Sequence, residues 1–365
     1  MQRVGRWILL TLLWVLVVAY VCYAASLARR AREAVRVSRF EVVVTDSTAR
    51  GSLLNEGEVH RTIRQAGLVV EHQRADSVDL TAIERLILRN GFVGSAEASL
   101  TKEGVLRVEL AQRMPILRLL TEGMNSYVTA EGYLFTPPQH SSLYVPVVTG
   151  SYRPPVPKGY SGSMRKQIDH ELWKIDTLIA SLERSKYPHY LAERQNDRKL
   201  REVRRMRTSK RWWKLESEEA FKERVEELRA IKADLRQKYR YKGRCIQAEI
   251  DRITLRQEAL RGEQKKLQKK YEDFAKLLTF VDQVEQNDFW RSELVEIIAQ
   301  TSDSGALELC LIPRSGAFTI RFGRIEEVEA KLEKLLRFYE RGLAAVGWSR
   351  YRELDIRFAD RVVCR

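Results

Sequence analysis

A basic block in the middle of the chain, residues 164–276, constrains the fold more than any other feature. It holds 32 Lys and Arg against 20 Asp and Glu, so it accounts for most of the net charge of +15. Its only proline is Pro188, and it has almost no strand pattern. Apolar side chains instead recur at every seventh position, which predicts a long helix with a coiled-coil seam. The series is Val225, Tyr239, Ile246, Ile253, Leu260, Leu267, Phe274 and Val281, broken only by Lys232.

The second edge of this seam is mostly polar. It runs through Leu228, Leu235, Lys242, Glu249, Gln257, Gln264, Tyr271 and Leu278. A seam with one apolar and one polar edge predicts an antiparallel helical hairpin of modest coiled-coil character. Gly243 and Gly262 are two candidate bends in the long helix, and the sequence does not choose between them.

Cations and aromatic residues alternate in one part of this block, where Lys210–Lys214 reads KRWWK. Such a pattern suits nucleic acid, anionic lipid or glycan. The alternative is that Trp212 and Trp213 are buried between helices while the charges are solvated, and we favour this alternative.

Residues 7–27 carry no charged side chain. At about 1.5 Å per residue, a helix of this length would reach roughly 32 Å and could cross a hydrocarbon core of about 30 Å. A cleaved signal peptide is the alternative, but its apolar region runs for only about 7 to 15 residues. Cleavage after Ala24 would also place Cys22 where a small residue is required. We therefore expect a retained transmembrane helix that contacts the lipid bilayer.

Charges on the two sides of this segment bear on its orientation. Two arginines precede it and five follow it, namely Arg3 and Arg6, then Arg29, Arg30, Arg32, Arg36 and Arg39. The positive-inside rule, taken alone, would place the large C-terminal part in the cytoplasm. Long domains can translocate against that bias, so the rule is weak evidence, but it still favours a cytoplasmic C-terminal part.

The four cysteines do not predict a disulfide framework. Cys22 lies in the apolar segment, which leaves an odd number elsewhere. Cys310 and Cys364 both fall in predicted strands and could be neighbours. Small buried hydrophobic side chains are their more common role.

Residues 40–110 predict a compact module with the order strand, helix, helix, strand, strand. The expected elements are a strand at Phe40–Thr45, a helix from Asn55 to near Gly67, a helix at Leu80–Arg89, and strands at Phe92–Leu100 and Val105–Leu110. Asn55 and Glu58 have capping-box spacing, and Asp79 precedes the second helix as an N-cap. This order is that of a POTRA domain.

Short strands flank the basic block on both sides. Residues 116–150 are rich in them, and Tyr152–Gly162 is a linker dense in proline and glycine. After the block we expect strands at Leu294–Thr301, Leu307–Ile312 and Ala317–Phe322, then an amphipathic helix at Ile325–Val346. The block therefore looks inserted into a single β domain.

The last fourteen residues, Arg352–Arg365, alternate between apolar and polar side chains with one exception on each face. This period of two predicts a half-buried strand. A terminal strand can present an open edge to a strand of another protein. The alternative, which alternation alone favours, is a final strand paired on both sides within its own sheet.

Motifs for catalysis are missing from the sequence. It has no Gly-rich phosphate loop, no GxSxG, no HExxH and no Cys/His cluster with metal spacing. The five histidines are scattered over segments of different predicted type, at His60, His72, His140, His170 and His189. We predict no enzyme activity, no metal, no cofactor and no small-molecule substrate.

Short motifs at the joints between elements resemble the FtsQ/DivIB family of bacterial cell-division proteins. They are Gln112–Pro115 (QRMP), Tyr127–Phe135 (YVTAEGYLF), Val145–Gly150 (VPVVTG), Asp288–Trp290 (DFW), Leu311–Gly316 (LIPRSG), Phe338–Tyr339, Gly347–Tyr351 (GWSRY), Asp355–Phe358 (DIRF) and Val362–Cys364. Each is weak alone, but together they occur in the family's order. The resemblance covers residues 1–150 and about 275–365. The basic insertion has no family counterpart that we recognise.

The resemblance implies an α+β protein with one transmembrane helix, a POTRA domain, and a mixed β domain interrupted by the helical, coiled-coil-like insertion. The expected parts are a cytoplasmic tail (1–6), a transmembrane helix (7–27), a basic linker (28–37), the POTRA domain (38–112), the β domain (113–152 and 276–365) and the insertion (153–275).

The resemblance also implies a non-enzymatic divisome scaffold that helps to control septal peptidoglycan synthesis. It would be a single-pass inner-membrane protein at the septum, with a cytoplasmic N-terminus and a periplasmic bulk. Its expected partners are FtsB-like and FtsL-like membrane proteins, with strand addition at residues 353–364 and no nucleic acid. The expected partner-binding residues are Leu354, Ile356, Arg357, Phe358, Asp360, Val362 and Cys364.

Two other function classes compete with this one. A periplasmic adaptor of a transport system also combines one anchor with a β domain and a helical hairpin. It would require two lipoyl-like half-motifs beside the hairpin, which the sequence lacks. A membrane-tethered nucleic-acid binder that uses the basic block would require the opposite topology.

Overall fold

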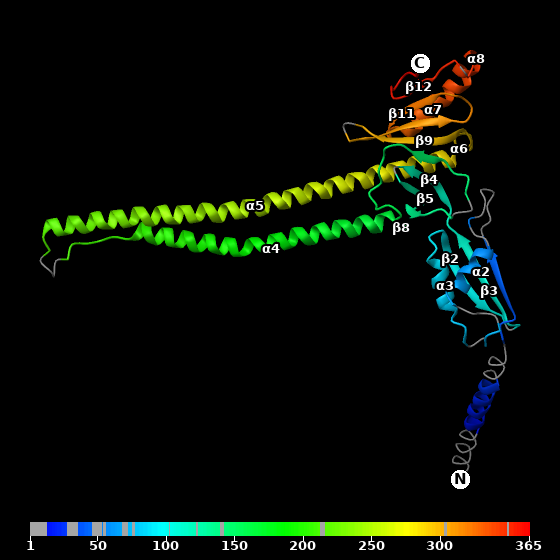
Figure 1. Cartoon of the computed structure of the whole chain (residues 1–365), viewed down its shortest axis with the longest axis horizontal. Coiled ribbons are helices and arrows are strands. Elements are labelled where there is room, and N and C mark those ends of the chain that lie inside the picture. The colour runs from blue at the N-terminus through cyan, green and yellow to red at the C-terminus, as the bar shows by residue number, and fades with distance from the viewer. Residues whose placement is uncertain are drawn as a thin grey trace, which may run out of the picture. The chain divides into compact units, whose positions relative to one another are not determined.

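A computed structural model gives the fold of this chain (Figure 1). It describes residues 13–27, 36–45, 53, 56–67, 72–74, 77–101, 103–121, 123–138, 142–211, 216–302, 305–348 and 350–365. The chain divides into two compact units. The first comprises residues 1–164 and 273–365, and the second comprises residues 165–272.

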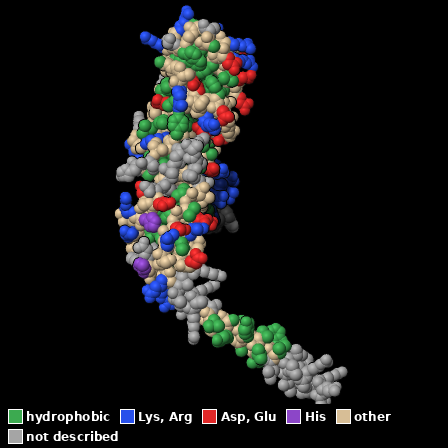
Figure 2. All heavy atoms as spheres, turned by 90° about the vertical axis from the view of Figure 1, so that its right-hand side faces the viewer, with side chains coloured by type: hydrophobic (Ala, Val, Ile, Leu, Met, Phe, Trp, Pro, Cys, Tyr) green, Lys and Arg blue, Asp and Glu red, His purple; other side chains and the backbone are tan. Residues whose placement is uncertain are grey.

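Residues 13–27 form a helix whose exposed side chains are almost all apolar, as Figure 2 shows in green. The predicted membrane-spanning segment, 7–27, begins outside the described residues. Within the part of the chain that the structure describes, no helix combines the length and the hydropathy that a membrane crossing requires.

The predicted order of the N-terminal module is confirmed. Its elements are β1 (Arg39–Val44), α2 (Glu56–Gln65), α3 (Leu80–Leu88), β2 (Val93–Leu100) and β3 (Val105–Gln112). The three strands form a sheet in the order β1-β3-β2, with β1 parallel and β2 antiparallel to β3. This is the strand–helix–helix–strand–strand module that the sequence predicts.

Local chemistry explains where α3 begins and how it packs. The side chain of Asp79 accepts a hydrogen bond from the backbone N–H of Ala82 at 2.9 Å, so it caps the helix as predicted. Ile83 and Ile87, one turn apart, share a face of the helix and are buried against the strands of the sheet. Asn55 of the predicted capping box lies outside the described residues.

The β domain is a single ten-stranded sheet. Its strands are β4 (Pro115–Thr121), β5 (Met124–Thr129), β6 (Tyr133–Phe135), β7 (Val147–Thr149), β8 (Gly162–Ser163), β9 (Leu294–Thr301), β10 (Leu307–Pro313), β11 (Thr319–Arg324), β12 (Glu353–Asp355) and β13 (Val363–Cys364). Their spatial order is β13-β12-β11-β10-β9-β7-β4-β5-β6-β8. The parallel pairing of β7 with β9 joins strands that lie before and after the basic block in the sequence.

The amphipathic helix predicted at 325–346 is shorter and less regular than expected. It starts as α7 (Val328–Phe338), continues as the π-helical turn η3 (Tyr339–Leu343), and ends as α8 (Ala344–Val346). Glu327 precedes α7 with φ of 51°, a left-handed conformation in which the chain cannot continue a right-handed helix toward Ile325. The π-helical turn carries Tyr339, which is buried.

Several of the short motifs meet around Tyr339. The ring centroids of Trp290, Phe318 and Trp348 lie 5.8, 6.1 and 5.2 Å from that of Tyr339, in edge-to-face geometry. Next to them, the buried carboxylate of Glu293 accepts a hydrogen bond from the hydroxyl of Ser315. The DFW, LIPRSG, FY and GW motifs therefore build one aromatic cluster between α6 (Asp288–Glu293), α7 and the sheet.

The helical unit is an antiparallel hairpin of α4 (Met164–Arg205) and α5 (Glu218–Gln286), side by side in Figure 1. Polar side chains link the two helices. Asn196 donates to the carbonyl of Tyr239 at 2.9 Å, and Gln257 donates to the carbonyl of Ile179 at 3.2 Å. Helix α5 runs without interruption through Gly243 and Gly262, so neither glycine ends it.

The irregularities in the predicted seam have structural roles. The ammonium group of Lys232 donates to the carbonyls of Arg204 at 3.3 Å and Met206 at 3.0 Å, where α4 ends and its last carbonyls lack helical partners. At Gly243, an added Cβ would lie 3.3 Å from Nδ2 of Asn196, so a small residue leaves room for the amide. Polar seam residues here replace apolar packing with hydrogen bonds between helices.

All four cysteines are free thiols. Cys310 on β10 and Cys364 on β13 are both half-buried and are separated by β11 and β12. Three inter-strand spacings amount to about 14 Å, well beyond the roughly 7 Å that a disulfide can span between Cα atoms. This geometry excludes a bond between them.

Candidate partner-binding site

The C-terminal residues do not form the single strand predicted from Glu353 to Cys364. They form a hairpin, in which β12 is followed by a bend at residues 356–362 and then by β13. The prediction of one continuous strand was therefore wrong. Apolar and polar side chains alternate through the bend as well, so the pattern does not show where the backbone turns.

Strand β12 is paired on both sides. It runs parallel to β11, with Leu354 opposite Ile320, and antiparallel to β13, with Leu354 opposite Cys364. The alternative considered from the sequence, a final strand paired on both sides within its own sheet, is therefore correct for β12. The edge of the sheet is instead the two-residue strand β13.

Apolar side chains anchor β12 from one face. Leu354 and Ile356 are fully buried, and the backbone N–H of Ile356 donates to the carbonyl of Arg321 at 3.1 Å. The predicted pattern is correct as far as Ile356. These two side chains hold the strand in the sheet and are not available for direct contact with a partner.

An ion pair within the chain directs the bend. Asp355 is only 2% exposed, and Arg357 binds its carboxylate through Nε at 3.0 Å and Nη2 at 2.7 Å. The Arg357 side-chain hydrogen bond lowers the pKa of Asp355 below its usual value. Arg357 also lies over Gly323, where an added Cβ would be 2.6 Å from Cγ of Arg357. Arg357, predicted to contact a partner, is thus paired within the chain, although its side chain is still 43% exposed.

Lys334 of α7 holds the bend from the other side. Its ammonium group donates to the carbonyls of Ile356 at 2.9 Å and of Phe358. Burial lowers the pKa of Lys334 from its usual value. No sequence pattern marks this residue, because Lys334 occupies an ordinary polar position of an amphipathic helix.

The tip of the hairpin is the most accessible part of the predicted site. Phe358 is 42% exposed, and the guanidinium of Arg361 lies 5.3 Å from the centroid of its ring. Asp360 is exposed, whereas Val362 and Cys364 are half-buried. An exposed aromatic ring beside an arginine is typical of residues that contribute most to protein interfaces.

A short ladder of about five backbone hydrogen bonds holds β13 in place. Glu353 and Arg365 exchange two of them, at 3.1 and 2.9 Å, and Arg352 donates to the carbonyl of Arg365 at 2.7 Å. The register makes Asp355 and Val363 the next hydrogen-bonded pair, which exchanges two more. Since Glu353 and Arg365 are a hydrogen-bonded pair, Leu354 and Cys364 are the adjacent non-hydrogen-bonded pair. The N–H and C=O groups of Cys364 therefore face away from β12, toward the open edge.

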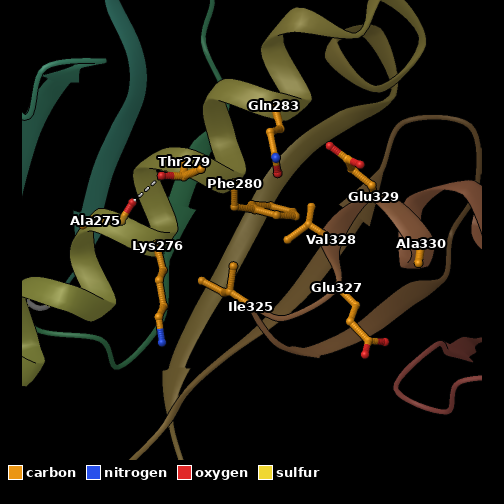
Figure 3. Close-up of a pocket in the computed structure, with 10 residues that line it drawn as sticks. All are labelled: Ala275, Lys276, Thr279, Phe280, Gln283, Ile325, Glu327, Val328, Glu329 and Ala330. Atoms are coloured by element: carbon orange, nitrogen blue, oxygen red, sulfur yellow. Dashed lines mark hydrogen bonds between the residues drawn. The ribbon is translucent and has the colours of Figure 1, made fainter.

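A cavity of about 590 Å³ lies elsewhere in this unit, between the last turns of α5 and the start of α7. Figure 3 shows Phe280, Ile325 and Val328 pointing toward one another within it. Among the residues that the structure describes, no group of three His, Cys, Asp or Glu side chains could hold a metal ion. The cavity is mainly apolar, and its polar side chains do not converge on one point as they would in a catalytic or ligand-binding site.

Comparison with known families explains this architecture. Residues 252–365 match the family model described as FtsQ/DivIB, C-terminal related, and residues 36–111 match that of a POTRA-like domain. The two matches together cover more than half of the chain. The chain belongs to the FtsQ/DivIB family. No curated protein matches this FtsQ/DivIB-family chain.

The C-terminal match begins at Arg252, inside α5. It therefore starts earlier than the boundary near residue 275 that the sequence motifs indicated. The last two motifs, Asp355–Phe358 and Val362–Cys364, fall within it and coincide with β12, the bend and β13. The distal part of the hairpin, before Arg252, lies outside both matches.

Proposed function

We propose that this FtsQ/DivIB-family chain is a cell-division scaffold at the membrane of the division site. It would be a non-enzymatic bitopic protein, anchored by residues 7–27, with its domains on the periplasmic side. There it would bind FtsB-like and FtsL-like membrane proteins and help to control septal peptidoglycan synthesis. The absence of catalytic motifs from the sequence is consistent with a role in binding alone.

The observation that carries the proposal is the short hairpin at the edge of the ten-stranded sheet. A strand from a partner would take the position of β13 and pair with β12. Strand addition to a sheet edge supplies affinity through main-chain hydrogen bonds and selectivity through alternate side chains. The present occupant is only two residues long, so it is a weak competitor for a longer strand.

The hydrogen-bond energies are compatible with the replacement of β13 by a partner strand. A backbone hydrogen bond contributes about 0.5–1.5 kcal/mol net, so displacing about five of them costs about 2.5–7.5 kcal/mol. An incoming strand regains these bonds with β12. Because β12 has three residues, the ladder alone gives modest affinity. The remaining affinity would come from side chains at the hairpin tip, chiefly Phe358.

Of the residues predicted to bind the partner, we assign direct contact to Phe358 and Asp360 at the tip. Val362 and Cys364 belong to the segment that the partner would displace. Leu354, Ile356 and Arg357 would act indirectly, because they hold β12 and the bend in position.

Replacing Phe358 with Asp should reduce capture of the FtsB-like partner at least tenfold, because a charge would replace the exposed ring at the interface. Co-purification of the full-length chain from membranes with its FtsB-like and FtsL-like proteins would measure this. The matched control is Leu120→Asp, which changes a side chain of similar exposure, 49%, on β4. Capture that survives Phe358→Asp, or that falls equally in the control, would place the interface elsewhere.

A further inference from the structure

Positive charge is concentrated in one part of the helical hairpin. We call residues 194–211 and 229–244 the distal basic segment. It contains 16 Lys and Arg against three Asp and Glu, whereas residues 165–193 contain five of each kind. The charge of the hairpin is therefore local, and the rest of α4 is nearly neutral.

The two halves of the distal basic segment lie side by side. Asn196 on α4 is bonded to the carbonyl of Tyr239 on α5, and Lys232 on α5 is bonded to the carbonyl of Arg204 on α4. Antiparallel packing thus brings two stretches that are separate in the sequence into one surface. Like charges this close repel one another, which makes an anionic partner favourable.

Many of these cations lack a carboxylate partner. Arg236, Arg240 and Arg244 recur every fourth residue on α5 and line a hollow of about 790 Å³. Among the described residues, no carboxylate lies within ion-pair distance of these three arginines, or of Arg201 and Arg205 on α4. In contrast, Arg224, nearer the start of α5, pairs with Glu216 at 2.8 Å.

Exposed apolar side chains are scattered among the cations. They are Met206, Ile231 and Tyr241, with exposed fractions of 38%, 53% and 64%. Met206 and Ile231 have no flat ring on which a nucleic acid base could stack, but they can insert among lipid acyl chains. The ring of Tyr241 has an apolar body and a polar hydroxyl, which suits the headgroup region of a bilayer. Arginines with long stems can reach headgroups while their neighbours enter the interface.

We propose that the distal basic segment binds the surface of an anionic lipid bilayer. The recognised groups are lipid phosphates, held by Arg236, Arg240, Arg244 and the outward arginines of α4. Each Lys or Arg near an anionic surface contributes about 1 kcal/mol, so the segment contains more than enough charge for stable binding at low salt. This site is separate from the terminal sheet edge and does not depend on the proposed partner docking.

Binding can be measured with the full-length chain held in nanodiscs of neutral phosphatidylcholine, which accommodate its apolar N-terminal segment. Added vesicles would contain phosphatidylglycerol and phosphatidylcholine in equal parts, or phosphatidylcholine alone. We expect capture on the anionic vesicles only, with a steep loss as salt is raised. The triple substitution Arg236→Gln, Arg240→Gln and Arg244→Gln should weaken capture at least tenfold.

The matched control removes the same number of charges outside the distal basic segment, by Arg256→Gln, Lys265→Gln and Lys269→Gln. It should retain capture, because these exposed residues lie on the other part of α5. Equal losses of vesicle capture in both triple variants would show that capture depends only on net charge, which would overturn the proposal. Tighter binding to a DNA oligonucleotide or to polyglutamate than to the anionic vesicles would overturn the choice of lipid. Circular dichroism of each variant checks that the hairpin remains helical.

Discussion

A disulfide that locks β13 onto β12 should abolish partner binding. Leu354 and Cys364 face each other as a non-hydrogen-bonded antiparallel pair, with Cα atoms expected about 4.5 Å apart. This spacing lies within the range for disulfides, so Leu354→Cys should form a bond with the natural Cys364. Since the partner strand must replace β13, oxidation should reduce capture of the FtsB-like partner at least tenfold.

Oxidised and reduced forms of this one variant supply the control. Replacing the buried Leu354 costs packing energy, but that cost is shared by both forms. Cys22 and Cys245, both exposed, would be changed to serine so that only the intended bond forms. If the oxidised form bound as well as the reduced form, the partner would not need the position of β13.

Removing the cover strand should have the opposite effect. Deletion of Arg361–Arg365 eliminates β13 and leaves one side of β12 unpaired. If the partner must first displace β13, affinity is reduced by the fraction of molecules in which the edge is open, and deletion removes that penalty. Even at the lower end, about 2.5 kcal/mol for the competing hydrogen bonds, affinity should rise more than tenfold.

This deletion is better suited to the question than removal of the last ten residues. The longer deletion would take away Ile356, which is fully buried, together with Arg357, which binds Asp355. A loss of binding after the longer deletion could then result from a disrupted core and not from loss of the sheet edge. Titration of the FtsB-like protein against the shorter deletion measures the edge alone. A fall in affinity would mean that the partner adds to β13 and leaves it in place.

Much of the fold follows from side-chain periodicity in the sequence. The N-terminal module was predicted because Asp79 marks a helix start and because β2 and β3 flank a short turn at 101–104. The hairpin was predicted because its seam repeats every seven residues. In both places the local sequence preferences favour the same structure as the tertiary packing, so the side-chain pattern is enough to predict the fold.

The terminal site was harder to predict for a physical reason. Alternation reports which face a side chain takes, but it does not report where the backbone turns. The bend depends on Asp355 and Arg357, only two residues apart, and on Lys334, which is distant in sequence. Asp355 and Arg357 lie on the same face of the predicted strand, so their attraction could have been considered from the sequence, although it was not predicted. The contact with Lys334 had no such signal.

Amide hydrogen exchange, measured by NMR with and without the FtsB-like protein, shows directly whether a partner strand displaces β13. In the free chain the N–H of Arg365 donates to Glu353 and the N–H of Glu353 donates to Arg365. On binding, we expect Arg365 to lose its protection while Glu353 keeps it, because the partner strand now accepts from Glu353. Unchanged protection at Arg365 in a fully bound sample would contradict this expectation.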